Sequence, residues 1–126
     1  MRRGEHGRKV GATVRVEVTR DRYECGEVLI RALHHYEDGF RRENSRSRAT
    51  LQGSIPATLP DVWEALFDAV LCAEDAVGTG QVEMIVDTDG VHDWREAMLR
   101  TLVWTVAYER KIPVRGPGSE AQLSLW

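Results

Sequence analysis

The first half of the chain alternates apolar and polar residues, a pattern that predicts extended strands. In residues 11–19 an alanine and three valines occupy every second position, with threonine, arginine or glutamate between them. This period of two is typical of a half-buried strand. Residues 27–36 fit either a helical stripe or an alternation, and the Asp-Gly pair at 38–39 favours a strand that turns into a hairpin. The stretch up to residue 52 is expected to return as a third strand, with a bulge or loop at Asn44-Ser45.

The second half of the chain changes to the spacing of helices. Apolar residues recur every three or four positions between residues 63 and 77, so we expect a helix that begins near Thr58 and Pro60 and ends at Gly78. A short apolar strand follows over 81–87, then a second helix from about 92 to 110 and a last short strand at 112–115. The predicted core positions are Trp63, Leu66, Phe67, Val70, Leu71 and Val77 in the first helix and Trp94, Met98, Leu99, Leu102, Val103 and Val106 in the second.

This order of elements predicts an α/β fold, in which a three-stranded antiparallel meander is followed by helix, strand and helix in one mixed sheet. We expect strands 11–19 and 81–87 to be neighbours, because both are short, apolar and bounded by turn residues, as the centre of a sheet usually is. Residues 1–9 are predicted to be a flexible basic arm. Residues 10–126 are predicted to be a single domain, of a size that one hydrophobic core can stabilise.

The composition argues against several classes of protein. The 42% of apolar and 29% of charged residues are ordinary for a globular chain and argue against disorder. Cys25 and Cys72 are too few and too far apart for a disulfide framework or a zinc site, so a reducing, cytoplasmic location is expected. No apolar stretch has the length of a membrane span or the pattern of a signal peptide, so we expect no membrane partner.

Charge is distributed unevenly along the chain, whose formal net charge is −3. Residues 1–50 contain 12 Lys or Arg and 8 Asp or Glu, whereas residues 51–126 contain 5 and 12. The basic side chains gather in the N-terminal arm and in the run Arg41, Arg42, Arg46 and Arg48. Such a run predicts contact with the phosphates of a nucleic acid, although an ordinary solvated loop has the same composition.

Asp87-Thr88-Asp89-Gly90, at the end of the predicted strand 81–87, is the most suggestive group of functional residues. Two carboxylates at the carboxyl end of a strand lie where α/β sheets bind ligands, and they suit Mg²⁺. The same residues suit a turn in which Asp89 caps the next helix. The segment is also similar to the first motif of haloacid-dehalogenase-like phosphotransferases, but only 36 residues follow Gly90 to hold that family's later motifs. An EF-hand loop is excluded, since Met98 stands where its last acidic ligand belongs.

Residues 12–110 resemble the ribonuclease-H-like fold, which begins with the same order of elements. In that family a glycine ends the third strand, a glutamate follows about ten residues later in the next helix, and an aspartate ends the fourth strand. Gly53, Glu64 and Asp87 stand at the matching places here. The resemblance implies hydrolysis of phosphodiester bonds in nucleic acid, with two Mg²⁺ or Mn²⁺ ions held by three or four carboxylates.

The resemblance also implies roles for individual residues. It makes Glu64 and Asp87 catalytic, and it makes the arginine run 41–48 the part that grips the nucleic-acid backbone. The first metal ligand belongs on the first strand, so the candidate ligands are Glu17, Asp21, Glu64, Asp87 and Asp89. Beyond the last helix only Glu120 remains for a fourth carboxylate. Glu64 equally fits a polar stripe that faces water, formed with Asp68, Cys72 and Asp75, so the residues alone leave hydrolysis open.

Two further patterns concern binding. Trp104 and Tyr108 are one turn apart on the side of the second helix opposite its core positions, which predicts that another chain or residues 119–126 cover them. The alternative to a nuclease is therefore a non-catalytic interaction or regulatory protein that uses this aromatic helix as a homodimer or partner surface.

His34 and His35 point to opposite faces of a strand, so they cannot share one metal ion, and we expect both at the surface.

Overall fold

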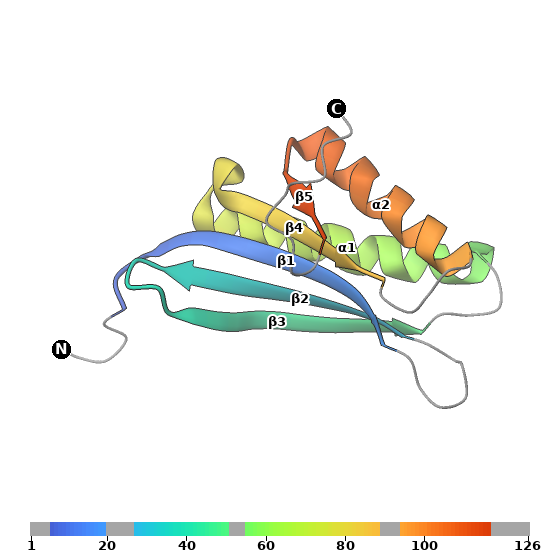
Figure 1. The fold of residues 1–126 in the computed structure, drawn as a ribbon, viewed down its shortest axis with the longest axis horizontal. Coiled ribbons are helices and arrows are strands. Elements are labelled where there is room, and N and C mark those ends of the chain that lie inside the picture. The colour runs from blue at the N-terminus through green and yellow to red at the C-terminus, as the bar shows by residue number, and fades with distance from the viewer. Residues whose placement is uncertain (1–5, 20–26, 51–54, 89–93, 117–126) are drawn as a thin grey trace.

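The alternating segments form strands and the periodic segments form helices in the computed structural model, which describes residues 6–19, 27–50, 55–88 and 94–116. The strands are β1 (Lys9–Thr19), β2 (Glu27–Tyr36), β3 (Arg41–Thr50), β4 (Val82–Asp87) and β5 (Val114–Arg115). The helices are α1 (Ile55–Val77) and α2 (Trp94–Arg110), and a short 3-10 turn, η1 (Thr79–Gln81), precedes β4. Figure 1 shows one curved sheet with α1 running along it and α2 beside α1.

The strands form a five-stranded mixed sheet in the order β3-β2-β1-β4-β5. β2 pairs antiparallel with β1 and β3, whereas β4 pairs parallel with β1 and β5. Parallel strands need a crossover, and α1 and α2 supply the two crossovers, from β3 to β4 and from β4 to β5. Such crossovers are right-handed. Each of the two crossovers leads to a strand that lies farther along the sheet in the same direction, so α1 and α2 cover the same face. The predicted α/β fold and the pairing of strands 11–19 and 81–87 are confirmed.

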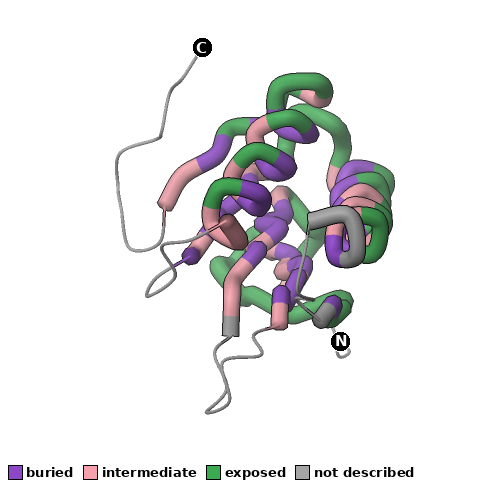
Figure 2. Tube along the Cα trace, turned by 90° about the vertical axis from the view of Figure 1, so that its right-hand side faces the viewer, coloured by how far each residue is buried: buried purple, intermediate pink, exposed green. Residues whose placement is uncertain are grey.

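The hydrophobic core lies between the sheet and the two helices. Residues at alternate positions of the central strands point into it and are at most 1% exposed, namely Val14 and Val16 of β1, Val28 and Ile30 of β2, and Met84 and Val86 of β4. Burying each such side chain contributes roughly 1.5–3 kcal/mol. Figure 2 shows buried positions interspersed with intermediate ones along the central strands. The intervening residues of these strands lie on the face without helices.

Helix α1 differs from its prediction in its start and in the side that it buries. It begins at Ile55, so Pro60 lies inside the helix, and Thr58 is a buried helical residue rather than a cap. Leu71, expected in the core, is 38% exposed. The residues that reach the core are Val62, Leu66, Ala69, Val70 and Ala73. Small side chains in this stripe allow the helix to lie close to the strands, and the bulkier Trp63 is therefore turned to the flank and half-buried.

The turn between β2 and β3 confirms the predicted hairpin, but it is not the two-residue turn that an Asp-Gly pair favours. Gly39 has a φ of +91°, whereas Asp38 is not among the residues with positive φ. The backbone closes through Gly39 N–H to Tyr36 O and Tyr36 N–H to Phe40 O, both at 2.9 Å. This is the three-residue loop in which a left-handed glycine follows a type I turn.

The start of the chain contacts this turn. Residues 1–5 of the predicted basic arm lie outside the described residues, and β1 begins at Lys9. His6 Nδ1 lies 2.8 Å from Asp38 Oδ2, and the His6 ring stacks on Phe40 with centroids 3.8 Å apart. Residue 6 therefore packs on the hairpin between β2 and β3.

The structure corrects the expectation that His34 lies at the surface. The two histidines do point to opposite faces, but His34 points to the helix side and is 1% exposed, whereas His35 is half-buried on the other face. Neither ring nitrogen of His34 has a hydrogen-bond partner among the described residues. Burial, with the nearby charge of Lys9, lowers the pKa of His34. The ring is therefore held neutral, at a cost of about 1–3 kcal/mol for the unpaired polar group.

We expect the protein to lose stability as the pH falls below the ordinary histidine pKa of 6.5. The folded pKa of His34 is below that value, so the unfolded chain takes up a proton first and acid favours unfolding. Thermal unfolding from about pH 7.5 to about pH 5 measures the effect. His34→Leu should reduce the acid-induced drop in melting temperature, and His6→Gln at an exposed site should not. Equal drops in wild type and His34→Leu would contradict this explanation.

Candidate functional site

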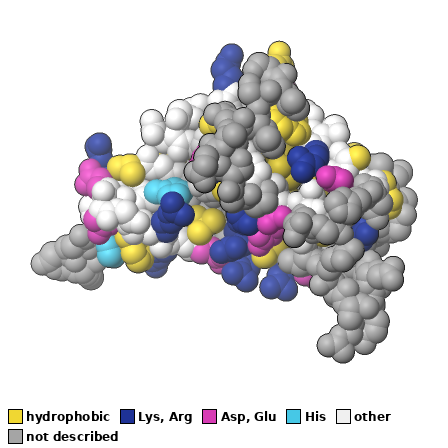
Figure 3. All heavy atoms as spheres, viewed as in Figure 1, with side chains coloured by type: hydrophobic (Ala, Val, Ile, Leu, Met, Phe, Trp, Pro, Cys, Tyr) yellow, Lys and Arg dark blue, Asp and Glu magenta, His cyan; other side chains and the backbone are white. Residues whose placement is uncertain are grey.

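The face of the sheet without helices carries charged side chains from all five strands. Figure 3 shows Lys or Arg and Asp or Glu side chains interspersed over the strands. The positive side chains on this face are Arg15, Arg31, Arg41, Arg46, Arg48 and Arg115, and the negative ones are Glu17, Glu27, Glu43, Glu83 and Asp87. They occupy the positions between the buried residues, so the alternation that builds the core also builds this charged face.

Glu17 and Asp87 are neighbours at the ends of the two central strands, because β1 and β4 pair with Glu17 opposite Asp87. Arg15 lies between the two carboxylates. Its Nε donates to Glu17 Oε2 at 2.8 Å, and its Nη2 donates to Asp87 Oδ2 at 2.9 Å. The three side chains are 19–26% exposed, so these charge-assisted hydrogen bonds are partly shielded from water and stronger than surface ion pairs.

Three of the four arginines predicted to bind substrate lie on the same face as this pair. Residues 41 and 46 would point to opposite faces of a regular strand, since they are five positions apart. Asn44, however, has no partner in the pairing of β3 with β2, and this bulge returns both side chains to one face. The bulge expected near residues 44–45 is thus confirmed. Arg42 pairs with His34 and points to the helix side.

Arginines stand directly opposite one another across the strands. Arg46 of β3 faces Arg31 of β2, Arg31 faces Arg15 of β1, and Arg115 of β5 continues the row beyond Ile85 of β4. Like charges directly opposite each other destabilise a sheet unless neighbouring charges compensate them. The compensation comes from the adjacent row, where Glu43 accepts hydrogen bonds from Arg46 and Arg31, which lower the pKa of Glu43.

A second polar chain crosses four strands nearer the start of β1. Thr13 donates to Glu83 Oε2 at 2.9 Å, and its oxygen lies 2.7 Å from His35 Nε2. Arg115 donates to both oxygens of Glu83, at 3.0 and 2.8 Å, and these hydrogen bonds lower the pKa of Glu83. Burial and the charge of Arg41 lower the pKa of His35. The sequence pattern placed Thr13 on a polar face, but it gave no signal for partners that come from distant segments.

The other predicted carboxylates are not brought together with Glu17 and Asp87 in the described part of the chain. Glu64 lies on the exposed side of α1, where it lines a hollow with Ser47 of β3. Asp21 and Asp89 lie outside the described residues. Among the residues that are described, no group of three or more His, Cys, Asp or Glu is placed to hold a metal ion. Of the five predicted ligands, Glu17 and Asp87 are thus the two that the structure brings together among the described residues.

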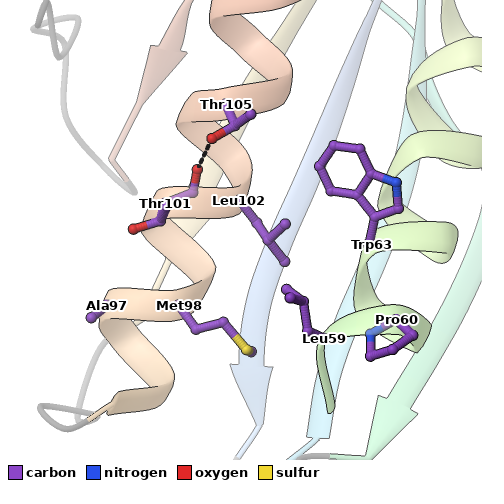
Figure 4. A pocket seen from close by; sticks show the side chains of 8 residues that line it. All are labelled: Leu59, Pro60, Trp63, Ala97, Met98, Thr101, Leu102 and Thr105. Atoms are coloured by element: carbon purple, nitrogen blue, oxygen red, sulfur yellow. Dashed lines mark hydrogen bonds between the residues drawn. The ribbon is translucent and has the colours of Figure 1, made fainter. Parts of the chain in front are cut away.

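An apolar groove lies between α1 and α2 (Figure 4). It has a volume of about 680 Å³ and is lined by Leu59, Pro60, Trp63, Ala97, Met98, Thr101, Leu102 and Thr105. The hydroxyl of Thr105 donates to the backbone oxygen of Thr101 at 2.7 Å, so one of the polar groups near the groove is already satisfied by the helix. The sequence did not predict the groove, because Trp63 and Leu102 were both assigned to the core.

The two aromatic residues predicted to form a partner surface have different environments. Trp104 is half-buried and packs against the core, whereas Tyr108 is 67% exposed. The chain end at 119–126, which was one of the two expected covers, lies outside the described residues. The structure therefore leaves both expected covers of Tyr108, a second chain and residues 119–126, as predictions.

Comparison with known proteins finds no match: no family model, no curated protein and no solved structure corresponds to this chain. Neither helix of the described residues has the length and apolar character needed to cross a membrane. The function is accordingly inferred from the geometry of the charged face and the groove.

Replacing Arg15 with glutamine should destabilise the protein by about 1–3 kcal/mol, because Glu17 and Asp87 would face each other without a cation between them. Urea unfolding measures the change. Arg48→Gln is the matched control, since its contact with Glu27 is 3.7 Å long and its side chain is 59% exposed. Adding Asp87→Asn to Arg15→Gln should recover part of the loss. Equal stability of the Arg15→Gln and Arg48→Gln variants would show that Arg15 does not hold the carboxylate pair.

Proposed function

We propose that this chain binds the sugar-phosphate backbone of nucleic acid on the helix-free face of its sheet. The observation that carries the proposal is the row of arginines across the strands, with Arg41 and Arg48 beside it on β3. Contacts from arginine to phosphate supply most of the affinity of sequence-independent nucleic-acid binding. An extended face of this kind suits a backbone better than a small, enclosed ligand.

The glutamates on the face do not prevent such binding. The Arg46–Glu43 and Arg48–Glu27 pairs are formed by arginine side chains that are 46% and 59% exposed. Pairs at such positions contribute only about 0–1 kcal/mol, so a phosphate can replace the glutamate at small cost. The remaining carboxylates moderate the positive charge, which predicts modest affinity with strong dependence on salt.

Hydrolysis of the bound backbone rests on the resemblance to ribonuclease-H-like proteins, which the order of elements supports. Glu17 and Asp87 are the described residues that would hold Mg²⁺ or Mn²⁺, and such ions would activate water and stabilise the leaving oxygen. Here Arg15 already donates hydrogen bonds to both carboxylates, and Arg31 also contacts Glu17. Binding without hydrolysis is therefore the function that the geometry favours.

Removing single arginines from the face should weaken binding to RNA, DNA and hybrid duplexes alike. Arg46→Gln and Arg48→Gln should each lower the affinity several-fold and reduce the slope of log K against log salt by about one, as expected for one lost phosphate contact. Fluorescence anisotropy at several salt concentrations measures both quantities. Arg42→Gln is the control, because it removes the same charge from the opposite side of the same strand. No binding by wild type at low salt would refute the proposal.

The same samples also test hydrolysis. Incubated with Mg²⁺ or Mn²⁺, wild type should cleave the nucleic acid only if a metal ion can replace Arg15 as the partner of Glu17 and Asp87. Asp87→Asn should then abolish cleavage while binding is retained. If the protein binds nucleic acid but does not cleave it, the proposed binding function stands and the proposed hydrolysis is refuted.

The groove between the helices supports a second candidate function, which is self-association through α2. Ala97, Thr101 and Thr105 follow one another at steps of one turn, and small side chains allow two helices to approach closely. Tyr108 lies on the same outward side, toward the carboxyl end. If two copies pack α2 against α2 in antiparallel orientation about a two-fold axis, Tyr108 of each copy reaches the groove of the other. The chain would then be a homodimeric interaction protein.

Tyr108→Asp and Thr101→Arg should each convert such a dimer into a monomer, since both place a charge in an apolar interface. Size-exclusion chromatography with light scattering measures the mass directly. Asp75→Arg, which lies on the exposed side of α1 away from the groove, should leave the mass unchanged. If the wild-type protein is still a monomer at about 0.1 mM, self-association is too weak to form a stable homodimer, and this candidate function is refuted.

A further inference from the structure

Two hollows on the charged face share one wall. The first, of about 320 Å³, lies over the middle of the strands, and the second, of about 400 Å³, lies at the start of β1 and β4. His35, Arg41 and Glu83 line both. Gly11 is the register partner of His35 and has no side chain to cover the imidazole. A Cβ at Gly11 would stand 3.3 Å from the backbone oxygen of Gln81, so glycine also suits the tight approach of η1.

Arg41 differs from the other arginines of this face. Arg15, Arg31, Arg46, Arg48 and Arg115 each contact a carboxylate. Arg41, in contrast, makes no hydrogen bond or ion pair with the described residues. It stands opposite His35 in the pairing of β3 with β2. Its guanidinium therefore has five N–H donors that the described residues do not use, at the wall that the two hollows share.

His35 supplies a second free group next to Arg41. The hydroxyl of Thr13 donates to Glu83, so its oxygen accepts from His35, and the imidazole carries its proton on Nε2. This leaves Nδ1 without a partner among the described residues. Nδ1 is an acceptor in the neutral ring and becomes a donor when the ring is protonated. A bound anion would favour the protonated form.

The charges that face His35 give the site a positive character. Arg41 of β3 and Arg115 of β5 lower the pKa of His35 after burial, and Glu83 of β4 acts in the opposite direction. Arg15 and Glu17 of β1 and Arg31 of β2 line the same hollow, while His34 on the other face is its chain neighbour. Since Glu83 is held by Arg115 and Glu17 by Arg15, no carboxylate among the described residues pairs with Arg41.

We propose that Arg41 and His35 form a binding site for a phosphoryl group at the junction of the two hollows. The guanidinium offers the paired N–H groups that fit two oxygens of a tetrahedral anion, and the protonated imidazole offers a third donor. The hollows have room for more than the anion itself, so the phosphoryl group belongs to a larger molecule. That group is either an internal phosphate of a nucleic-acid backbone or the terminal phosphate of a free nucleotide. The site stands on Arg41 and His35 and does not require the function proposed above.

Sulfate is the probe for the site, because its charge does not change over the range in which histidine titrates. Titration of wild type with sulfate at constant ionic strength, followed by the NMR signals of the His35 ring, should shift these signals and raise the pKa of His35. Binding should be tighter at about pH 5.5 than at about pH 7.5, and His35→Gln should remove this dependence. Arg41→Gln should weaken sulfate binding about tenfold, and Arg46→Gln, outside both hollows, should have little effect.

Two comparisons identify the source of the phosphoryl group. If the site takes a terminal phosphate, adenosine monophosphate should compete with sulfate, and a 5′-phosphorylated oligonucleotide should bind more tightly than its unphosphorylated form. If it takes an internal phosphate, both oligonucleotides should displace sulfate equally. A sulfate affinity that is equal in wild type and in a folded Arg41→Gln variant would overturn the proposal. Sulfate binding without nucleic-acid binding would support this site and refute only the function proposed above.

Discussion

The double pairing of β1 is the constraint on which the rest of the structure depends. β1 pairs with β2 on one side and with β4 on the other, and its side chains alternate between two very different environments. Ala12, Val14 and Val16 are at most 2% exposed, while Arg15 and Glu17 face the side without helices. A shift of one residue would bury these charges and expose the valines, which would cost several kcal/mol for each ion. The register is therefore fixed from both faces at once.

The charged face follows from this register. Residues directly opposite each other across the strands have like charges, as in Arg15 with Arg31 and Glu17 with Asp87. Such pairs are unfavourable by themselves, but Arg15, Arg31, Arg46, Arg48 and Arg115 each contact a carboxylate on the same or a neighbouring strand. Arg15 does so twice, to Glu17 and to Asp87. The charged face is therefore stabilised by ion pairs between residues that are not directly opposite each other in the strand pairing.

The sequence predicted the parts of the fold that depend on local periodicity. The alternation in residues 11–19 and the apolar run at 81–87 were sufficient to place two neighbouring central strands, because period-two patterns report which face is buried. The start of α1 was predicted wrongly, because Pro60 is tolerated inside the helix and the usual start signals do not apply. Leu71 was also predicted wrongly, because it is exposed. The apolar stripe of a helix can be wider than the side that is buried, and packing against the strands decides which residues of the stripe reach the core.

The candidate site was predictable only in its residue types. Glu17, Asp87 and three of the four arginines share one face as a consequence of strand pairing, and the bulge at Asn44 decides the side on which Arg46 lies. Arg15 as the partner of both carboxylates depends on the parallel pairing of segments far apart in the chain, for which local patterns carry no signal. Glu64 was placed by spacing along the sequence, yet α1 presents it to the solvent on the helix side of the sheet.

The pairing of charges on this face bears on the sign of the ligand that we propose. Each of its carboxylates, Glu17, Glu27, Glu43, Glu83 and Asp87, forms an ion pair with at least one arginine. The groups left over in the described residues are the Arg41 guanidinium and Nδ1 of His35, which are adjacent in the register. A cation that binds the carboxylates would have to break an existing ion pair, whereas an anion meets the Arg41 guanidinium, which makes no hydrogen bond or ion pair with the described residues. These features support the proposal that the face recognises a phosphorylated molecule rather than cleaving nucleic acid with metal ions.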